Sequence, residues 1–432
     1  MKTRRLWLIA VGIVSLSFGV VAAQETPPVV SAALQGQMDQ IESTTSTIRG
    51  LDSTDPIERD FPTRADLREY VNTVLDEEMN PELAARLLLF YAAFDLLPPD
   101  ADLRELYETL LNAQIAGFYD IDTRIMNVVL FSGDTPGDQL PVMEQIIYSH
   151  EYVHALQDMH FGLETLGLTS EQSINEPDRT MALQALIEGD ATQVMNQYAI
   201  VATQDNPMAV FSILGSALQS GGLFLPQGTP PVIANELMYP YLAGAEFVAA
   251  LYGRGGWAAV DGAYVDLPQS TEQILHPDRY FAGDEPIAVT LRPDDTDYTA
   301  ALGEGWSLVW DRTMGEFYLR EYLDTQLAGR SARMAAEGWG GDRYLIFHNE
   351  ETGGLAWVVR FVWDTPEDAA EFAEAFAEFG NTRFEAEKTE LSDDCWTSDA
   401  EALCIVDEGE NGHLLAFAPS QAAAQALMVA QQ

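Results

Sequence analysis

The sequence predicts an α+β protein, in which a mainly helical part with a short antiparallel edge sheet precedes a small C-terminal α+β unit. The helical part is predicted by apolar residues that recur every three or four positions, both between residues 57 and 116 and between about 178 and 202. The C-terminal unit is predicted by the order of elements after residue 341, which is strand, strand, helix, two or three strands and a last helix.

The N-terminus has the pattern of an export signal. Basic residues at positions 2, 4 and 5 precede an apolar run over 6–21, and Val21-Ala22-Ala23 offers small residues to a signal peptidase. We therefore expect a signal peptide over 1–23 and a mature protein that is secreted or located at the cell surface or in the periplasm. An uncleaved N-terminal anchor is the alternative. No later stretch stays apolar for about 18 residues, so no membrane span is expected after cleavage.

The segment after the signal is polar before the helical pattern begins. Residues 24–56 are rich in Thr, Ser and Pro, which indicates a linker that contains one helix over Ala33–Arg49. Helices are expected up to residue 116. Gly117–Asp120 and Ile125–Leu130 then have the apolar and β-branched character of two strands joined by a turn.

The C-terminal part of the chain divides at about residue 341. A helical pattern over 304–337 precedes this point and strand patterns follow it, so we expect one domain over 57–340 and a second unit over 341–432. The only two cysteines of the chain, Cys395 and Cys404, lie in this second unit. Their proximity in an exported chain predicts a disulfide that clips a hairpin, with two buried thiols as the alternative.

The composition excludes one class of partner. The chain has 432 residues with 68 acidic and 22 basic side chains, which gives a net charge of −46. Nucleic-acid binding is not expected, because Lys and Arg are the residues that recognise the phosphate backbone. Apolar residues make up 47% of the chain, which is enough to build sizeable cores.

A metal-binding pattern, His150-Glu151-Tyr152-Val153-His154, lies in one of the predicted helices. Pro141 suits the start of this helix, because its missing N–H is not needed in the first turn, and Gly162 suits its end. Two histidines four residues apart lie on one face of a helix and can each direct a nitrogen at one metal ion. Glu151 lies next to them and suits the role of a base that acts on water at the metal.

A third ligand is expected on the following helix. Glu188 lies on a stripe of apolar and small residues, where a carboxylate is anomalous, and Gly189 beside it weakens the helix by about 1 kcal/mol relative to Ala. A single neighbouring helix explains both features if it approaches at Gly189 and carries a cation that Glu188 reaches. Two imidazoles and a carboxylate suit a catalytic Zn²⁺ ion. His160 is the alternative third ligand, although six helical residues rotate it about 240° away from His154.

The pattern H-E-Y-V-H, followed one helix later by E-G-D-A, resembles the gluzincin group of zinc metallopeptidases. The resemblance implies a zincin-like metallopeptidase core within residues 57–340 and Zn²⁺ as the cofactor. It implies His150, His154 and Glu188 as metal ligands and Glu151 as the general base. Exported bacterial proteins with such a core and an unassigned C-terminal part are the group that the whole chain resembles.

Two further stretches are similar to parts of this group. Gly117–Phe131 resembles the edge-strand region that lines the cleft and pairs with an extended substrate. Pro240-Tyr241-Leu242-Ala243-Gly244 resembles the P-Y-x-x-G stretch of the aminopeptidase branch, in which the Tyr stabilises the oxyanion. This implies Tyr241 for that role, with Tyr239 as the second candidate.

The chain also departs from the group. Thr192 stands where many members have an Asp that contacts the first ligand histidine, so Asp190 or Asp158 is the candidate for orienting a ligand. We find no copy of the exopeptidase motif of the aminopeptidase branch, so exopeptidase specificity is not carried over.

The sequence therefore predicts an exported zinc endopeptidase that hydrolyses a peptide or protein with a zinc-activated water and Glu151 as base. One alternative is a surface or periplasmic binding protein of the same fold that keeps zinc without turnover. Another is a metzincin-like site with His160 as third ligand. Glu151 beside the ligands favours catalysis, because a binding role requires no base.

Overall fold

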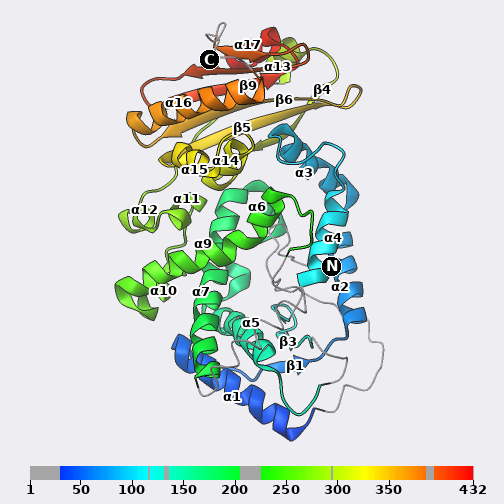
Figure 1. The fold of residues 1–432 in the computed structure, drawn as a ribbon, viewed down its shortest axis with the longest axis vertical. Coiled ribbons are helices and arrows are strands. Elements are labelled where there is room, and N and C mark those ends of the chain that lie inside the picture. Colours follow the sequence, from blue (N-terminus) through cyan, green and yellow to red (C-terminus); the bar gives the residue numbers. More distant parts are fainter. Residues whose placement is uncertain are drawn as a thin grey trace. The chain divides into compact units, whose positions relative to one another are not determined.

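The computed structural model describes residues 30–114, 117–130, 136–204, 225–292, 295–385 and 394–431 (Figure 1). It has the α+β class that the sequence predicts, with helices through most of the chain and a six-stranded antiparallel sheet near the C-terminus. The expected signal peptide over 1–23 and Phe131 lie outside the described residues. Among the described helices, none has the length and apolar character needed to cross a membrane.

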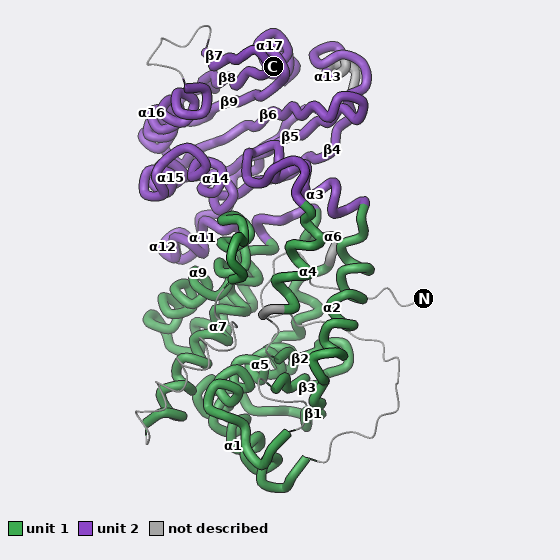
Figure 2. Tube along the Cα trace, turned by 45° about the vertical axis from the view of Figure 1, so that its right-hand side comes forward, with its two compact units in different colours: residues 1–81, 102–174, 180–268 green, residues 82–101, 175–179, 269–432 purple. Residues whose placement is uncertain are grey.

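The chain forms two compact units, which Figure 2 shows in different colours. Unit 1 comprises residues 1–81, 102–174 and 180–268, and unit 2 comprises residues 82–101, 175–179 and 269–432. These limits differ from the expected boundary at residue 341.

A strand in the preceding segment explains the difference. β4 (Trp306–Arg312) lies where the sequence pattern predicts only helix, and it pairs antiparallel with β5 (Trp339–Asn349) across the expected boundary. Residues before 341 therefore belong to unit 2, because the backbone hydrogen bonds between β4 and β5 join them to its sheet.

Unit 1 is mainly helical. Its principal helices are α1 (Ala32–Arg49), α2 (Arg64–Glu78), α4 (Leu103–Gln114), α5 (Val142–Phe161), most of α7 (Pro177–Thr203), α9 (Pro231–Gly255) and α10 (Trp257–Ala263).

The first of these helices is part of the core of unit 1. Leu34, Met38 and Ile41 lie on one stripe of α1 and share an apolar cluster with Tyr152 and Leu156 of α5. The polar composition of residues 24–56 indicated a linker, but the three- and four-residue spacing of these side chains decides the outcome. The predicted helix over 33–49 is confirmed, and it is a core helix.

A small sheet in unit 1 contains the two strands that the sequence predicts. β2 (Phe118–Asp120) pairs antiparallel with β3 (Ile125–Asn127). A third strand, β1 (Glu58–Asp60), pairs parallel with the other side of β3, so the sheet is mixed and has the order β1-β3-β2. One side of β2 is therefore unpaired with any described strand.

Unit 2 is built on the six-stranded sheet. The strands are β4, β5, β6 (Gly354–Trp363), β7 (Cys395–Thr397), β8 (Ala402–Asp407) and β9 (Gly412–Ala418), in the order β4-β5-β6-β9-β8-β7. The helices are α3 (Pro81–Ala93), α11 (Thr271–Leu275), α12 (Pro277–Ala282), α13 (Asp295–Leu302), α14 (Gly315–Asp324), α15 (Gly329–Ala336), α16 (Pro366–Arg383) and α17 (Gln421–Val429).

Helices cover both faces of this sheet (Figure 1). α17 and α13 pack on one face, where Leu427 joins a cluster with Leu345 and Val358. α16 packs on the other face through aromatic contacts, for example between Phe372 and Trp363. Each strand therefore buries alternate side chains on opposite sides.

The expected disulfide is present in unit 2. Cys395 and Cys404 are bonded to each other and lie directly opposite one another on the neighbouring strands β7 and β8. The predicted hairpin clip is thus confirmed.

Helix α9 is longer than the sequence suggested and contains a proline in its interior. The Pro and Gly content of residues 204–235, of which 205–224 lie outside the described residues, predicts loops, and the sequence pattern predicts a helix only over Tyr241–Tyr252. The structure continues the helix from Pro231 to Gly255 through Pro240. Burial of apolar side chains on both sides of Pro240 outweighs its cost of roughly 3 kcal/mol in a helix interior.

Two glycines allow α7 and α9 to approach closely. A Cβ atom added at Gly189 of α7 would lie 2.2 Å from the backbone C and O atoms of Gly244 in α9. A Cβ at Gly244 would lie 2.1 Å from the carbonyl oxygen of Ala185. The close helix approach predicted at Gly189 is therefore confirmed, and it requires glycine on both sides.

Gly189→Ala is expected to lower the free energy of unfolding by about 1–3 kcal/mol, because the new methyl group cannot fit without moving a helix. Urea denaturation measures the change. Gly253→Ala, on the neighbouring helix α9, is the control, since nothing lies within 4 Å of a Cβ at this position. That control is expected to be stabilised by about 0.5–1 kcal/mol, and equal losses in both variants would contradict the account.

Candidate metal centre

Helix α5 places two histidines side by side. It begins after Pro141, runs without a break through Gln157 to Phe161, and ends at Gly162, whose φ of 64° is left-handed. The predicted helix limits are confirmed. His150 and His154 are both buried, and their Nε2 atoms are 3.2 Å apart.

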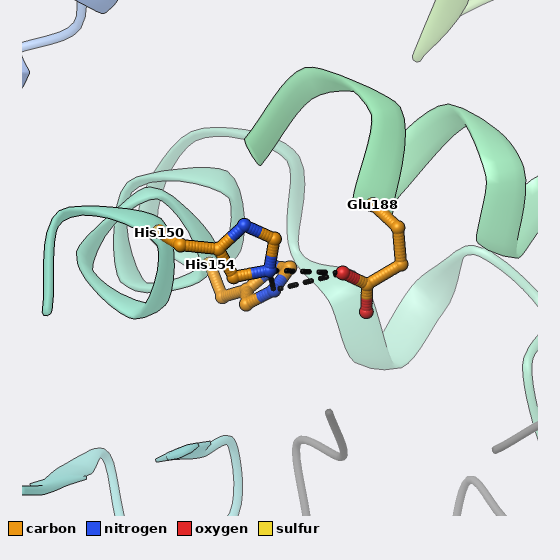
Figure 3. Close-up of side chains that lie close together, drawn as sticks. All are labelled: His150, His154 and Glu188. Carbon is orange, nitrogen blue, oxygen red and sulfur yellow. Dashed lines mark hydrogen bonds and ion pairs between the residues drawn. The ribbon is translucent and has the colours of Figure 1, made fainter. Parts of the chain in front are cut away.

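Glu188 of α7 completes the cluster with His150 and His154 (Figure 3). Its Oε2 atom lies 3.0 Å from Nε2 of His150 and 3.5 Å from Nε2 of His154. Among the described residues, this is the one group of three His, Cys, Asp or Glu side chains whose ligand atoms all lie within 4.8 Å of one another. The Glu188 side chain is 13% exposed to solvent and is the least buried of the three.

The two anomalies at residues 188 and 189 have separate causes. Their proximity in the sequence favours one neighbouring helix as the cause of both. In the structure, Gly189 faces α9 at Gly244, whereas Glu188 reaches the histidines of α5. Adjacent helical residues point about 100° apart, so they contact different neighbours.

His160 lies away from this cluster. It is exposed, and its Nε2 atom donates a hydrogen bond to the carbonyl oxygen of Asp52 at 2.7 Å. Because α5 remains helical through Gln157, the turn that would bring a third histidine back to His154 does not occur.

The three clustered side chains affect one another's pKa values strongly. Burial lowers the pKa of His150, against the effect of its hydrogen bond to Glu188. Burial alone would also lower the pKa of His154, but the Glu188 charge raises it to about 9. Burial alone would raise the pKa of Glu188, but the charge of His154 and the bonds to both histidines lower it to about 2.

The donor set fits a zinc ion. Two imidazole nitrogens and one carboxylate oxygen converge in a buried place, and these are atom types that a metal cation binds. Three protein ligands of these types are the set found at catalytic zinc sites, where a fourth position stays open.

Glu151 lies between the ligand pair and the small sheet. It is buried, and its Oε2 atom accepts a hydrogen bond of 3.3 Å from the backbone N–H of Tyr119 in β2. Its Oε1 atom is also buried and accepts no hydrogen bond from a described residue. Burial raises the pKa of Glu151 to about 8. A Cβ at Gly117 would lie 3.6 Å from Cγ of Glu151, so the start of β2 is in contact with this side chain.

Gln157 orients His154. The Nδ1–H group of His154 donates to Oε1 of Gln157 at 2.8 Å, which leaves the Nε2 lone pair directed at the cluster. The amide of Gln157 donates in turn to the carbonyl oxygen of Ile187 at 2.9 Å and to Oδ2 of Asp190 at 3.2 Å. The orienting side chain is therefore tied to α7 next to Glu188.

A buried ion pair continues this network to α1. Oδ1 of Asp190 lies 2.7 Å from Nε of Arg49, and both side chains are fully buried. Arg49 also contacts Asp261 at 2.7 Å, and Tyr264 donates to Oδ2 of Asp190 at 3.0 Å. Removing one partner of such a pair is costly, because the other charge stays buried.

These contacts show which of the two candidate carboxylates orients a ligand histidine. Of the two candidates, Asp190 acts on His154 through Gln157, whereas Asp158 accepts a hydrogen bond of 3.2 Å from Tyr119. Sequence reasoning missed Gln157 and Arg49. Position 157 lies one turn after His154, which is a usable signal, but no pattern connects Arg49 to a site more than a hundred residues away.

Tyr241 lies next to the first ligand. Its ring centroid is 6.0 Å from that of His150, with an angle of 35° between the ring planes. Gly244, one turn later in α9, makes the close contact with α7. The glycine contact therefore brings Tyr241 near the cluster. Tyr239 is buried in the same helix.

Comparison with known proteins gives one match. Residues 307–428 match a family model described as a domain of unknown function (DUF8575). No curated protein and no solved structure matches the chain. The matched segment lies in unit 2, and the His150, His154 and Glu188 cluster lies outside it.

Gln157→Leu is expected to lower zinc affinity about 10- to 100-fold, because His154 loses the acceptor that orients its ring. Competition with a chelator of known affinity measures the change. Gln145→Leu is the matched control, since Gln145 lies on the same helix and bonds to Leu140 at 2.8 Å. Unchanged affinity in Gln157→Leu would contradict an orienting role.

Proposed function

We propose that this protein is an exported zinc metallopeptidase that cleaves peptide bonds within a peptide or protein chain. The observation that carries the proposal is the convergence of His150, His154 and Glu188, with Glu151 buried beside them. The export signal expected over residues 1–23 supports the location.

Three side chains would hold the metal. His150 and His154 each offer an Nε2 atom and Glu188 offers a carboxylate oxygen. A bound zinc ion supplies a Lewis acid that lowers the pKa of water to about 7 and polarises a carbonyl oxygen.

Glu151 has the position of a general base. The Tyr119 N–H group holds Oε2, and Oε1 remains to take a proton from the attacking water. The same carboxyl group then gives this proton to the amine that leaves. A carboxylate fixed at one oxygen and available at the other suits both transfers.

The edge of β2 suits an extended substrate. β2 pairs with β3 on one side, and on the other side the Tyr119 N–H group is directed at Glu151. A peptide that added to this edge as a further strand would have its backbone beside the base. Because the Tyr119 N–H group is engaged by Glu151, such a peptide would pair with other main-chain groups of this edge, and this binding mode requires little from the substrate sequence.

Tyr241 is the side chain we propose for oxyanion stabilisation. Its ring lies beside that of His150, on the helix that packs against the helix of Glu188. A phenol that donates a hydrogen bond to a developing oxyanion stabilises the transition state more than the ground state.

Glu151→Gln is expected to retain stoichiometric zinc and to lose about 10²- to 10⁴-fold in kcat, because the amide cannot take a proton. Metal analysis and hydrolysis of a mixed peptide library measure the two properties. Glu164→Gln changes an exposed Glu just after α5 and is expected to leave both unchanged. A zinc-loaded wild-type protein that cleaves no peptide would refute the peptidase proposal.

Tyr241→Phe is expected to lower kcat about 10²-fold with little change in KM, since the lost hydrogen bond is made in the transition state. Steady-state kinetics on one cleaved peptide measures both constants. Tyr239→Phe removes the hydroxyl of the second candidate and is expected to have a smaller effect on kcat. A larger loss in Tyr239→Phe would transfer the role to Tyr239.

A further inference from the structure

Asp158 places a second buried carboxylate on the helix that carries the proposed base. It lies about two turns after Glu151 on α5, so the two side chains point to the same face of the helix. Asp158 is only 6% exposed. Its Oδ2 atom accepts a hydrogen bond of 3.2 Å from the hydroxyl group of Tyr119, and the backbone N–H group of Leu163 also bonds to the carboxylate. The carboxylate is therefore fixed in place and faces β2.

Tyr119 is held to α5 at both of its ends. Its backbone N–H group donates to Oε2 of Glu151 at 3.3 Å, and its hydroxyl group donates to Asp158. The side chain between these two bonds is fully buried. Because a tyrosine side chain has few rotatable bonds, a bond at its hydroxyl group restricts where its backbone N–H group can lie.

The other face of β2 is fixed by a different helix. Successive side chains of a strand point to opposite faces, so Phe118 points away from Tyr119. The Phe118 ring stacks on that of Tyr70 in α2, with the ring centroids 5.0 Å apart and 9° between the ring planes. β2 is therefore anchored to α5 through Tyr119 and to α2 through Phe118. The strand cannot rotate about its own axis without breaking one of these contacts.

The hydrogen bond between Tyr119 and Glu151 depends on this anchoring. At 3.3 Å, the separation of the Tyr119 nitrogen from Oε2 of Glu151 is long for an N–H···O bond, so a small shift of the strand would break it. Oε1 of Glu151 accepts no hydrogen bond from a described residue. Without the Tyr119 bond, the carboxylate of the proposed base would be free to turn and would no longer present a fixed oxygen to water.

We propose that Asp158 is a positioning residue for the base. By holding the hydroxyl group of Tyr119, it keeps the N–H group of the same residue on Oε2 of Glu151. This role rests on the proposed function, because Glu151 is the base of that reaction. Asp158 acts through Tyr119 and requires no contact of its own with substrate or metal. Supporting contacts of this kind hold reactive groups in the productive geometry.

Steady-state kinetics of the zinc-loaded mature chain tests the proposal. Tyr119→Phe and Asp158→Leu are expected to retain zinc and to lose about 10-fold in kcat, with less than about a 3-fold change in KM. The base is then misplaced, whereas the β2 edge stays paired with β3. Asp158→Asn is expected to recover most of kcat, since its amide oxygen can accept the same bond from Tyr119.

Arg124→Gln is the matched control. The Nε atom of Arg124 lies 3.5 Å from Oδ2 of Asp158, the same oxygen that Tyr119 contacts, but the Arg124 side chain is 69% exposed. An exposed ion pair contributes little, so this variant is expected to keep wild-type kcat and KM. A loss in Arg124→Gln equal to that in Asp158→Leu would overturn the proposal, because the charge of Asp158 and not its bond to Tyr119 would then be what matters.

Hydrogen exchange of the residue 119 amide measures the same contact without catalysis. In the mature chain without substrate, this amide is expected to exchange about 10-fold faster in Tyr119→Phe and Asp158→Leu than in the wild type, while the amides of β3 keep their protection. Unchanged exchange at residue 119, or faster exchange throughout unit 1, would overturn a local positioning role. Wild-type kcat in both variants, or equal losses in Asp158→Asn and Asp158→Leu, would do so as well.

The two measurements separate this inference from the proposed function. If the wild type cleaves no peptide, the proposed function fails, and the exchange rates alone decide whether Asp158 fixes the Tyr119 N–H group. If Asp158→Leu does not fold, Tyr119→Phe removes only a hydroxyl group and supplies both readouts.

Discussion

The structure of unit 1 depends on one constraint, which is that three electron-rich atoms meet in a buried place. Nε2 of His150, Nε2 of His154 and Oε2 of Glu188 lie 3.0 to 3.5 Å from one another. Unpaired polar groups in an apolar interior cost free energy, and the contacts of Glu188 with both histidines offset part of that cost. The helices that carry these residues are held in position by further contacts.

Two kinds of contact supply that support. One is polar and runs from His154 through Gln157 and Asp190 to Arg49, so that α5, α7 and α1 are connected by buried hydrogen bonds and an ion pair. The other is steric and consists of the contact between Gly189 and Gly244, which brings α9 against α7. The polar network orients a ligand, and the steric contact sets the distance of Tyr241. Both lie outside the patterns by which metal sites are usually identified.

Buried arginines in the two units are stabilised in different ways. In unit 1, Arg49 has its own carboxylates, so its charge is neutralised within the protein. In unit 2, Arg312 instead stacks on the ring of Trp310, although the chain as a whole is strongly acidic. The ring supplies part of the electrostatic stabilisation that a carboxylate would give.

The sequence by itself determined the local features of this protein. The limits of α5 follow from Pro141 and Gly162, the helical position of the two histidines follows from their spacing, and the cysteine hairpin follows from nine residues of separation. These features depend on backbone conformations and contacts within a few turns. The role of Glu188 could be predicted for a related reason, because a carboxylate on an apolar stripe is anomalous wherever it occurs.

Only the tertiary structure decided the rest. Apolar packing keeps α9 helical through Pro240, against the local preference of that residue. It also buries the helix around Leu34 in the core, although the composition of that segment is polar. Strand pairing across residue 341 placed β4 in unit 2, and distant segments brought Arg49 to Asp190 and Arg86 to Trp310. Such contacts join residues far apart in the chain. Their free energy comes from burial in the folded state, which composition and periodicity do not encode.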